Sequence, residues 1–462
     1  MVFSSLTFLF AYLPITLLIY FLVPLRFRNF ILLLVSLFFY GWGEPVYVLV
    51  MIGSIIMNYL FAFPIQKYLD TNKELSKRWL ILCIIFNLCL LGFFKYYDFL
   101  AETLNMIGLT FIKPLHISLP IGISFYTFQT MSYPIDLYRK ETSIQKNLIN
   151  FGAYVCMFPQ LIAGPIVRYV DIDKQLENHP SSYEKFYEGI KRFTIGLSKK
   201  VLLANNTGII FEEISKLSST DTSIVIAWIG IIAYAFQIYF DFSGYSDMAI
   251  GLGKMLGFEF LENFNYPYIA ETITDFWRRW HMSLSYWFRD YVYIPLGGNR
   301  LGKKRQIINI LIVWLLTGLW HGASWNFLLW GMFYGIVLLI EKLFLMKYLK
   351  KCPSFIRHIY TLLIVLIAWV LFAFTDLSKG INYLSLLFGG TRFINDYALY
   401  YLRDNAFLFI VCILACTPIA KTKWNIFKKY EFLVPLVVIL LLFIDTAFIV
   451  DASYNPFLYF RF

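Results

Sequence analysis

Two histidines in aromatic surroundings are the side chains best suited to chemistry. His321 lies in the run LTGLWHGASW, between two apolar segments, and His281 ends the run DFWRRWH. An ionisable side chain at membrane depth is costly, so it is by default a candidate for function. Desolvation by the flanking Trp320 and Trp325 would keep the His321 imidazole neutral, which is the form that a general base requires.

Each histidine also has a purely structural interpretation. His321 could be a buried residue that is hydrogen-bonded to a neighbouring helix. His281 could belong to a cluster of aromatic and arginine side chains at the level of the lipid headgroups. In its functional interpretation, His281 is a second polar group that faces the same cavity as His321 and binds or orients a substrate.

The composition places both histidines in a membrane protein. Of the 462 residues, 59% are apolar and 15% are charged, whereas a soluble domain carries about 25% charged residues. A membrane-spanning helix uses about 20 residues, so the apolar content suffices for about 11 to 13 helices. This excludes a soluble globular enzyme, a disordered chain and a fibrous repeat. The long continuous apolar runs argue against a membrane β-barrel, and we expect an all-α polytopic fold.

The basic residues predict the orientation of the chain. The net charge is +11, and in a membrane protein such an excess reflects cytoplasmic loops and contact with anionic membrane lipids rather than nucleic acid. Four basic loops are expected on the cytoplasmic side: Lys67–Arg78, Arg278–Arg305, Lys342–Arg357 and Lys421–Lys429. Arg26 and Arg28 place the loop after the first span on the same side, so Met1 is expected outside, as is the other end of the chain.

The apolar segments predict spans of unequal length, some of them short or re-entrant: 6–23, 29–41, 45–63, 79–97, 119–137, 149–166, 191–210, 224–247, 306–320, 324–341, 358–375, 404–420 and 431–450. Residues 306–341 have basic residues at both ends, so they form a broken hairpin of about 16 residues per arm, too short to cross the membrane. Because irregular backbone at membrane depth must be covered by protein or line a water-filled space, a central cavity is expected.

We expect one integral membrane domain over residues 1–462. Its segment 254–305 lacks a long apolar run, and its aromatic and arginine residues predict amphipathic helices at the cytoplasmic interface or in the mouth of the cavity. The run YFDFSGYSDMAIG places Asp241 at the polar end of span 224–247. The scattered cysteines have no zinc-ligand spacing, and no metal site is predicted.

Several motifs resemble the membrane-bound O-acyltransferase (MBOAT) family, and specifically its bacterial branch that acetylates exported polysaccharides such as alginate or peptidoglycan. The matching stretches extend across almost the whole chain: MVFSSLTFLFAYLPI, LPIGISFYTFQTMSYPIDLYR, FPQLIAGPIVRY, YFDFSGYSDMAIGLGKMLGF, NFNYPYIAETITDFWRRWHMSLSYWFRDYVYIPLGGNR, TGLWHGASWNFLLWG and NPFLYFRF.

The resemblance implies a funnel-shaped helical enzyme of the bacterial inner membrane. The invariant histidine of the family maps onto His321, and its second polar position maps onto His281. The family takes its acyl group from a cytoplasmic thioester, and a secreted or periplasmic esterase-like partner often completes the transfer to the polysaccharide. Further candidates for substrate or donor binding are Trp277, Arg278, Trp280, Trp320, Thr317, Asp241 and Arg168.

The expected reaction is transfer of an acetyl group from a cytoplasmic donor such as acetyl-CoA, with no permanently bound cofactor. Basic residues of 278–305 would hold the donor's phosphates, and His321 would take the proton of the acceptor hydroxyl. His281, or a nearby arginine or tryptophan, would stabilise the oxyanion. In a different assignment, His321 carries the acyl group transiently.

Two other functions stay open at this point. One is D-alanyl transfer to teichoic acid from a small carrier protein, in a neighbouring branch of the same family. The other is transport or flipping of a lipid-linked sugar, which many spans and a broken central hairpin would also fit. The sequence contains no repeated half, which argues against the transporter.

Overall fold

The computed structural model describes residues 1–162, 164–218, 221–419, 422, 431–452, 454 and 458. Over these residues the chain is helical and contains no strand, which confirms the all-α prediction. Seven of the described helices are long and apolar enough to cross a membrane, and a bent pair of helices could add an eighth. The basic loop Lys421–Lys429 lies almost wholly outside the described residues, as does most of the closing run NPFLYFRF.

The described residues form two compact units. Unit 1 comprises Met1–Phe193 and Tyr245–Leu261, and unit 2 comprises Thr194–Gly244 and Glu262–Phe462. Two helices contribute to both units: α9 (Tyr183–Ser198) and α11 (Ile224–Leu256). The other helical segments of unit 1 are η1 (Phe8–Tyr12), α1 (Leu13–Leu22), α2 (Leu25–Gly43), α3 (Tyr47–Leu69), α4 (Lys73–Met106), α5 (Ile123–Arg139), α6 (Leu148–Cys156), α7 (Phe158–Leu161) and α8 (Tyr169–Glu177).

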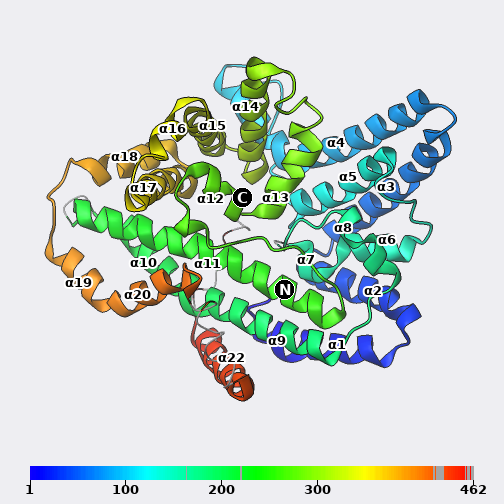
Figure 1. Ribbon diagram of the computed structural model, residues 1–462, viewed down its shortest axis with the longest axis horizontal. Coiled ribbons are helices and arrows are strands. Elements are labelled where there is room, and N and C mark those ends of the chain that lie inside the picture. Colours follow the sequence, from blue (N-terminus) through cyan, green and yellow to red (C-terminus); the bar gives the residue numbers. More distant parts are fainter. Residues whose placement is uncertain are drawn as a thin grey trace. The chain divides into compact units, whose positions relative to one another are not determined.

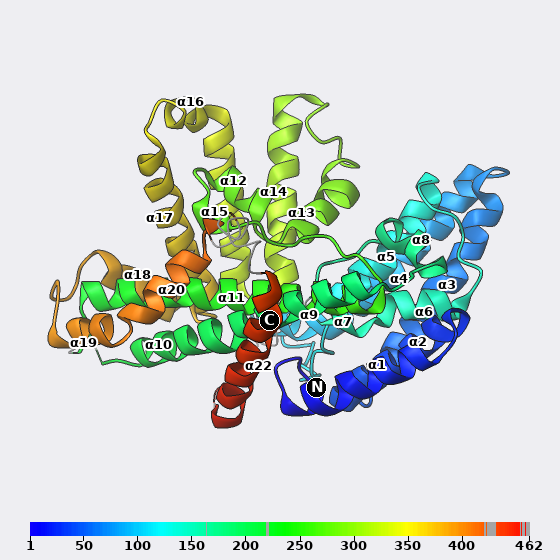
Figure 2. The same ribbon diagram turned by 60° about the horizontal axis from the view of Figure 1, so that its bottom comes forward.

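Polar side chains connect α3, α4 and α5, which lie side by side in unit 1 (Figures 1 and 2). Asn58 of α3 donates to Oδ1 of Asn87 of α4 at 3.0 Å, and Asn87 donates back to Asn58 at 2.8 Å. Thr130 of α5 donates to the same Asn87 oxygen at 3.3 Å. Such bonds stabilise helix contacts where water is absent. They help to explain why α5 is almost fully buried although its sequence is rich in polar residues.

Unit 2 carries both candidate histidines. Its helical segments besides α11 are η2 (Lys199–Ala204), α10 (Asn205–Ser215), η3 (Pro267–Ile269), α12 (Ile273–Arg279), α13 (Met282–Phe288), η4 (Arg289–Tyr293), α14 (Gly302–His321), α15 (Trp325–Ile340), η5 (Glu341–Leu345), α16 (Met346–Leu349), α17 (Ser354–Ala373), α18 (Leu377–Phe388), α19 (Asp396–Asp404), α20 (Ala406–Ala415) and α22 (Val434–Asp451).

Glycines allow α14 and α15 to pack backbone against backbone (Figures 1 and 2). A Cβ atom on Gly318 would lie 2.4 Å from the carbonyl oxygen of Phe327, and one on Gly331 would lie 2.3 Å from that of Trp314. Real Cβ atoms do not come so close to backbone, so larger residues would separate the two helices. This contact fixes the end of α14, where His321 lies.

Several predicted spans have different ends in the structure. The second arm of the hairpin 306–341 was expected to be too short to cross the membrane, but the helix that begins at Trp325 continues to Leu349 and is long and apolar enough to cross it. Span 79–97 belongs to the longer α4, and span 191–210 belongs to a continuous helical stretch that begins with α9. Span 224–247 was expected to end in a polar run, but α11 continues to Leu256. The helix continues because ion pairs compensate its buried charges: Asp241 pairs with Lys200 at 2.7 Å, and Asp247 pairs with Arg192 at 2.6 Å.

Candidate active site

His321 lies at the last residue of α14, inside a cluster of aromatic rings. Its ring centroid is 5.0 Å from that of Trp320, 4.9 Å from Trp330 of α15 and 5.2 Å from Phe372 of α17. Only 5% of its surface is exposed. Three helices therefore hold the imidazole in an apolar environment, as the tryptophan-rich sequence around it predicted.

His281 lies in the turn between α12 and α13. Its backbone is left-handed, with φ 45°, a conformation that residues other than glycine adopt only where the surrounding structure enforces it. The enforcing contact is a hydrogen bond at 2.9 Å from the Met282 amide to the Asn263 carbonyl oxygen. The His281 ring contacts Phe242 at 4.6 Å and Trp320 at 5.6 Å between centroids. Trp320 thus contacts both candidate imidazoles.

The hydrogen bonds of Asn263 determine the tautomer of His281. Oδ1 of Asn263 lies 3.1 Å from Nδ1 of His281, and it also accepts from the amide and the hydroxyl of Ser283 at 3.2 and 2.9 Å. Because this amide oxygen only accepts, Nδ1 carries the proton and Nε2 carries the lone pair. Nε2 has no hydrogen-bond partner among the described residues. It is therefore the ring nitrogen that can accept a hydrogen bond from a substrate.

Burial keeps this imidazole neutral. His281 is outside the helices that qualify as spans, and its desolvation lowers the pKa from 6.5 to about 3. At neutral pH the ring is uncharged, so Nε2 retains its lone pair.

We expect acidification to destabilise the protein through His281. The unfolded chain takes up a proton below about pH 6.5, whereas the folded His281 does not, so the free energy of unfolding decreases as the pH falls. Between about pH 7.5 and pH 5.0 this effect amounts to about 2 kcal/mol. Thermal unfolding at both pH values, compared between the wild type and His281→Gln, measures it. Equal pH dependence in the two proteins would show that His281 is not held neutral.

A buried carboxylate positions α12, the helix that precedes His281. Glu341 of η5 is fully buried. It accepts hydrogen bonds from the amides of Ile273 and Thr274 at 2.7 and 2.9 Å, from the Thr274 hydroxyl at 2.7 Å, and from the Tyr360 hydroxyl at 3.2 Å. These bonds pair the free amides at the start of the helix. The sequence analysis did not single out Glu341, and its only signal is a carboxylate at the end of an apolar run.

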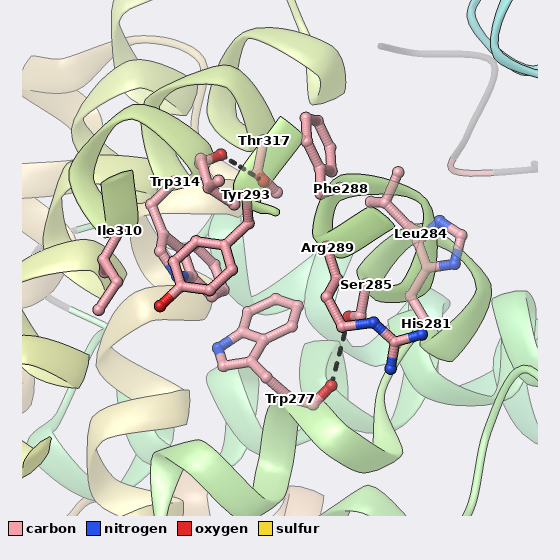
Figure 3. A pocket seen from close by; sticks show the side chains of 11 residues that line it. Trp277, His281, Leu284, Ser285, Phe288, Arg289, Tyr293, Ile310, Trp314 and Thr317 are labelled. Atoms are coloured by element: carbon pink, nitrogen blue, oxygen red, sulfur yellow. Dashed lines mark hydrogen bonds between the residues drawn. The ribbon is translucent and has the colours of Figure 1, made fainter. Parts of the chain in front are cut away.

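A cavity of about 190 Å³ opens beside His281. In Figure 3 the side chains of α14 lie on the left, those of α13 lie on the right with His281, and Trp277 lies below. His321 is not among the residues that line this cavity, although Trp314 and Thr317, which precede it on α14, are. The complete lining is Trp277, His281, Leu284, Ser285, Phe288, Arg289, Tyr293, Ile310, Val313, Trp314 and Thr317.

The structure brings three further predicted residues close to the histidines. Trp277 lines the cavity, and its ring lies 4.7 Å from Trp314 and 4.9 Å from Tyr334. Its Nε1 has no hydrogen-bond partner among the described residues. Thr317 also lines the cavity and donates to its own helix, to the Val313 carbonyl oxygen at 2.8 Å. Trp320 contacts both histidine rings, as described above.

The remaining predicted residues have other surroundings. Trp280 is buried in the unit 2 core, 5.6 Å from Phe276 and 5.0 Å from Trp369 between ring centroids. Asp241 is engaged by Lys200 and by the amide of Leu458 at 2.9 Å.

Two predicted arginines also lie outside the cavity lining. Arg278 is exposed. Arg168 belongs to unit 1, where both its Nε and its Nη2 donate to Asp171, at 2.8 and 2.7 Å. The structure therefore places neither side chain on the cavity, although the sequence motifs suggested both.

Comparison with known proteins identifies a family and several relatives. The model of the membrane-bound O-acyltransferase family, MBOAT, matches residues 137–384, a range that contains both histidines. The probable alginate O-acetylase AlgI of Azotobacter vinelandii is 45% identical over 80% of this chain and 75% of its own length. The peptidoglycan O-acetyltransferase of Helicobacter pylori is 35% identical over 89% of this chain and 83% of its own length. A teichoic acid D-alanyltransferase of Streptococcus thermophilus is 30% identical over 49% of this chain and 58% of its own length.

Proposed function

Because this chain belongs to the membrane-bound O-acyltransferase family, we propose that it transfers an acetyl group from a cytoplasmic thioester donor, acetyl-CoA, for O-acetylation of a cell-surface polysaccharide. The family and the relatives make it an O-acyltransferase and a multi-pass membrane protein. We further propose that the transferred group is acetyl, that acetyl-CoA donates it, and that the acceptor is a polysaccharide of the alginate or peptidoglycan type. We also propose that the protein lies in the bacterial inner membrane with both chain ends outside.

The single observation that carries the proposal is the pair of buried imidazoles that share Trp320, one of which lines a small cavity. The cavity beside His281 has a volume of about 190 Å³. That space suits the acetyl end of a thioester better than a long acyl chain. The lining is mostly aromatic and apolar, so it excludes water that would otherwise hydrolyse the thioester.

In the proposed reaction, His321 takes the proton of the acceptor hydroxyl as the oxygen attacks the thioester carbonyl. The tetrahedral intermediate then collapses: the new ester bond is kept, the carbon–sulfur bond breaks, and the leaving thiolate takes up the proton. The unpartnered Nε1 of Trp277 is suited to donate to the oxyanion. His281 was expected to stabilise the oxyanion, but its Nδ1–H tautomer favours a different role, in which Nε2 accepts a hydrogen bond from the substrate.

Exposed cations are suited to hold the donor's phosphates. Arg278, Arg300, Lys303 and Lys304 are exposed. Arg289, which lines the cavity, pairs with Asp290 at 2.7 Å. Guanidinium and ammonium groups bind phosphate through charge-assisted hydrogen bonds. A secreted or periplasmic esterase-like protein would complete the transfer outside the cell.

Deletion of the gene is expected to abolish acetyl groups on the cell-surface polysaccharide, and a plasmid copy should restore them. Mass spectrometry of the purified glycan detects the loss through the mass that each acetyl group adds. Loss of D-alanine from teichoic acid, with acetylation intact, would contradict the proposal and favour the alternative reaction. Intact acetylation with reduced movement of a lipid-linked sugar would instead indicate a transporter.

A further inference from the structure

We infer that Asn263 is the positioning residue of the site: it holds His281 with Nδ1 protonated and Nε2 ready to accept from a substrate. The inference rests on the proposed function, because it concerns how one of the two candidate histidines is oriented. Asn263 is fully buried and lies 18 positions before His281 in the sequence. Both residues fall in the run NFNYPYIAETITDFWRRWH, but the sequence alone does not show that they contact each other.

Asn263 fixes both the backbone and the side chain of the turn. Its carbonyl oxygen accepts from the Met282 amide at 2.9 Å, which holds the left-handed backbone at His281. Its Oδ1 accepts from Nδ1 of His281 at 3.1 Å. An imidazole has two nitrogens that can exchange roles, and the partner of one nitrogen determines which of them carries the lone pair. Loss of the side-chain oxygen would leave His281 free to rotate or to move its proton to Nε2.

The neutral amide is suited to this role. A carboxylate at the same place would favour the imidazolium, which lacks a lone pair at either nitrogen. An amide oxygen selects the tautomer without adding charge. The aromatic contacts to Phe242 and Trp320 then restrict the ring plane. The Asn263 amide engages Nδ1, and the two aromatic rings restrict the plane of the imidazole. Nε2 is then the one ring nitrogen of His281 that has no partner among the described residues.

The test compares Asn263→Leu, which removes the acceptor at similar volume, with Asn263→Asp, which keeps an oxygen acceptor. The matched control is Ser283→Ala, which removes a hydrogen bond to the same Oδ1 but leaves the bond to His281 intact. Transfer from radiolabelled acetyl-CoA to polysaccharide is measured in membrane vesicles at pH 8, with kcat and the donor KM determined separately. Thermal unfolding of each variant in detergent reports its stability.

We expect Asn263→Leu to lower kcat at least about thirtyfold, within the range for a positioned acid–base group, while the donor KM changes less than about threefold. Asn263→Asp should recover most of kcat at pH 8, and Ser283→Ala should behave like the wild type. A folded Asn263→Leu protein with wild-type kcat would overturn the inference. So would Ser283→Ala with the same loss, because the oxygen would then serve only to stabilise the turn.

If Asn263→Leu does not fold, Asn263→Asp decides the question at pH 8, where an imidazole beside a carboxylate is again neutral. A folded Asp variant that is inactive at pH 8 would also overturn the inference. His281→Ala separates this inference from the proposed function. An inactive His281→Ala together with an active Asn263→Leu contradicts only the positioning role. Full activity of His281→Ala contradicts the role of the histidine itself.

Discussion

Replacement of His321 by alanine is expected to reduce acetyl transfer about a thousandfold, because general-base catalysis contributes about 10²–10⁴-fold. The effect should appear in kcat, since the imidazole acts on the acceptor proton and is not among the residues that line the cavity beside His281. The measurement is acetyl content of the polysaccharide in a complemented deletion strain, followed by vesicle kinetics with radiolabelled acetyl-CoA.

The matched control for His321 is His116→Ala, which removes an exposed histidine and should leave the rate unchanged. Thermal unfolding shows whether the His321→Ala protein still folds, because its aromatic neighbours lose a packing partner. A folded variant with full activity would remove His321 from the mechanism. Donor label that stays on the wild-type protein and is absent from His321→Ala would assign the histidine to transient acyl transfer instead.

Replacement of Glu341 by alanine is expected to cause the largest loss of stability, at least about 4 kcal/mol, because four donors lose their acceptor. The carboxylate accepts from two backbone amides and two hydroxyls, and each buried donor left unpaired costs about 1–3 kcal/mol. Because these bonds hold the start of α12, Trp277 and His281 should also shift and transfer should decrease. Chemical unfolding in detergent micelles measures the stability.

Two further variants calibrate the Glu341 result. Glu341→Gln keeps one carbonyl oxygen and should lose less stability than Glu341→Ala. Tyr360→Phe removes a single bond to the carboxylate and should cost about 1 kcal/mol. A Glu341→Ala protein as stable as Tyr360→Phe would show that the carboxylate does not hold α12.

The sequence predicted the fold class, which the structure confirms, and it singled out both histidines as candidates, because both inferences depend on local information. Apolar composition reveals helices suited to a membrane, and the tryptophan-rich runs around His281 and His321 mark the family. It also suggested Asp241 and Arg168 as binding residues, but each has an ion-pair partner, Lys200 and Asp171 respectively. A sequence motif does not distinguish a charged residue that binds a substrate from one that forms an ion pair with a neighbouring helix.

Composition and periodicity by themselves determined a helical membrane protein with two histidines in aromatic runs. Only the tertiary structure decided which nitrogen of His281 is available and what holds α12, through Asn263, 18 positions away, and Glu341, 68 positions from Ile273. The physical reason is that a hydropathy pattern records which face of a helix is buried, over a few turns of chain. A hydrogen bond between distant segments is determined by how the helices pack, and packing leaves no periodic trace in the sequence.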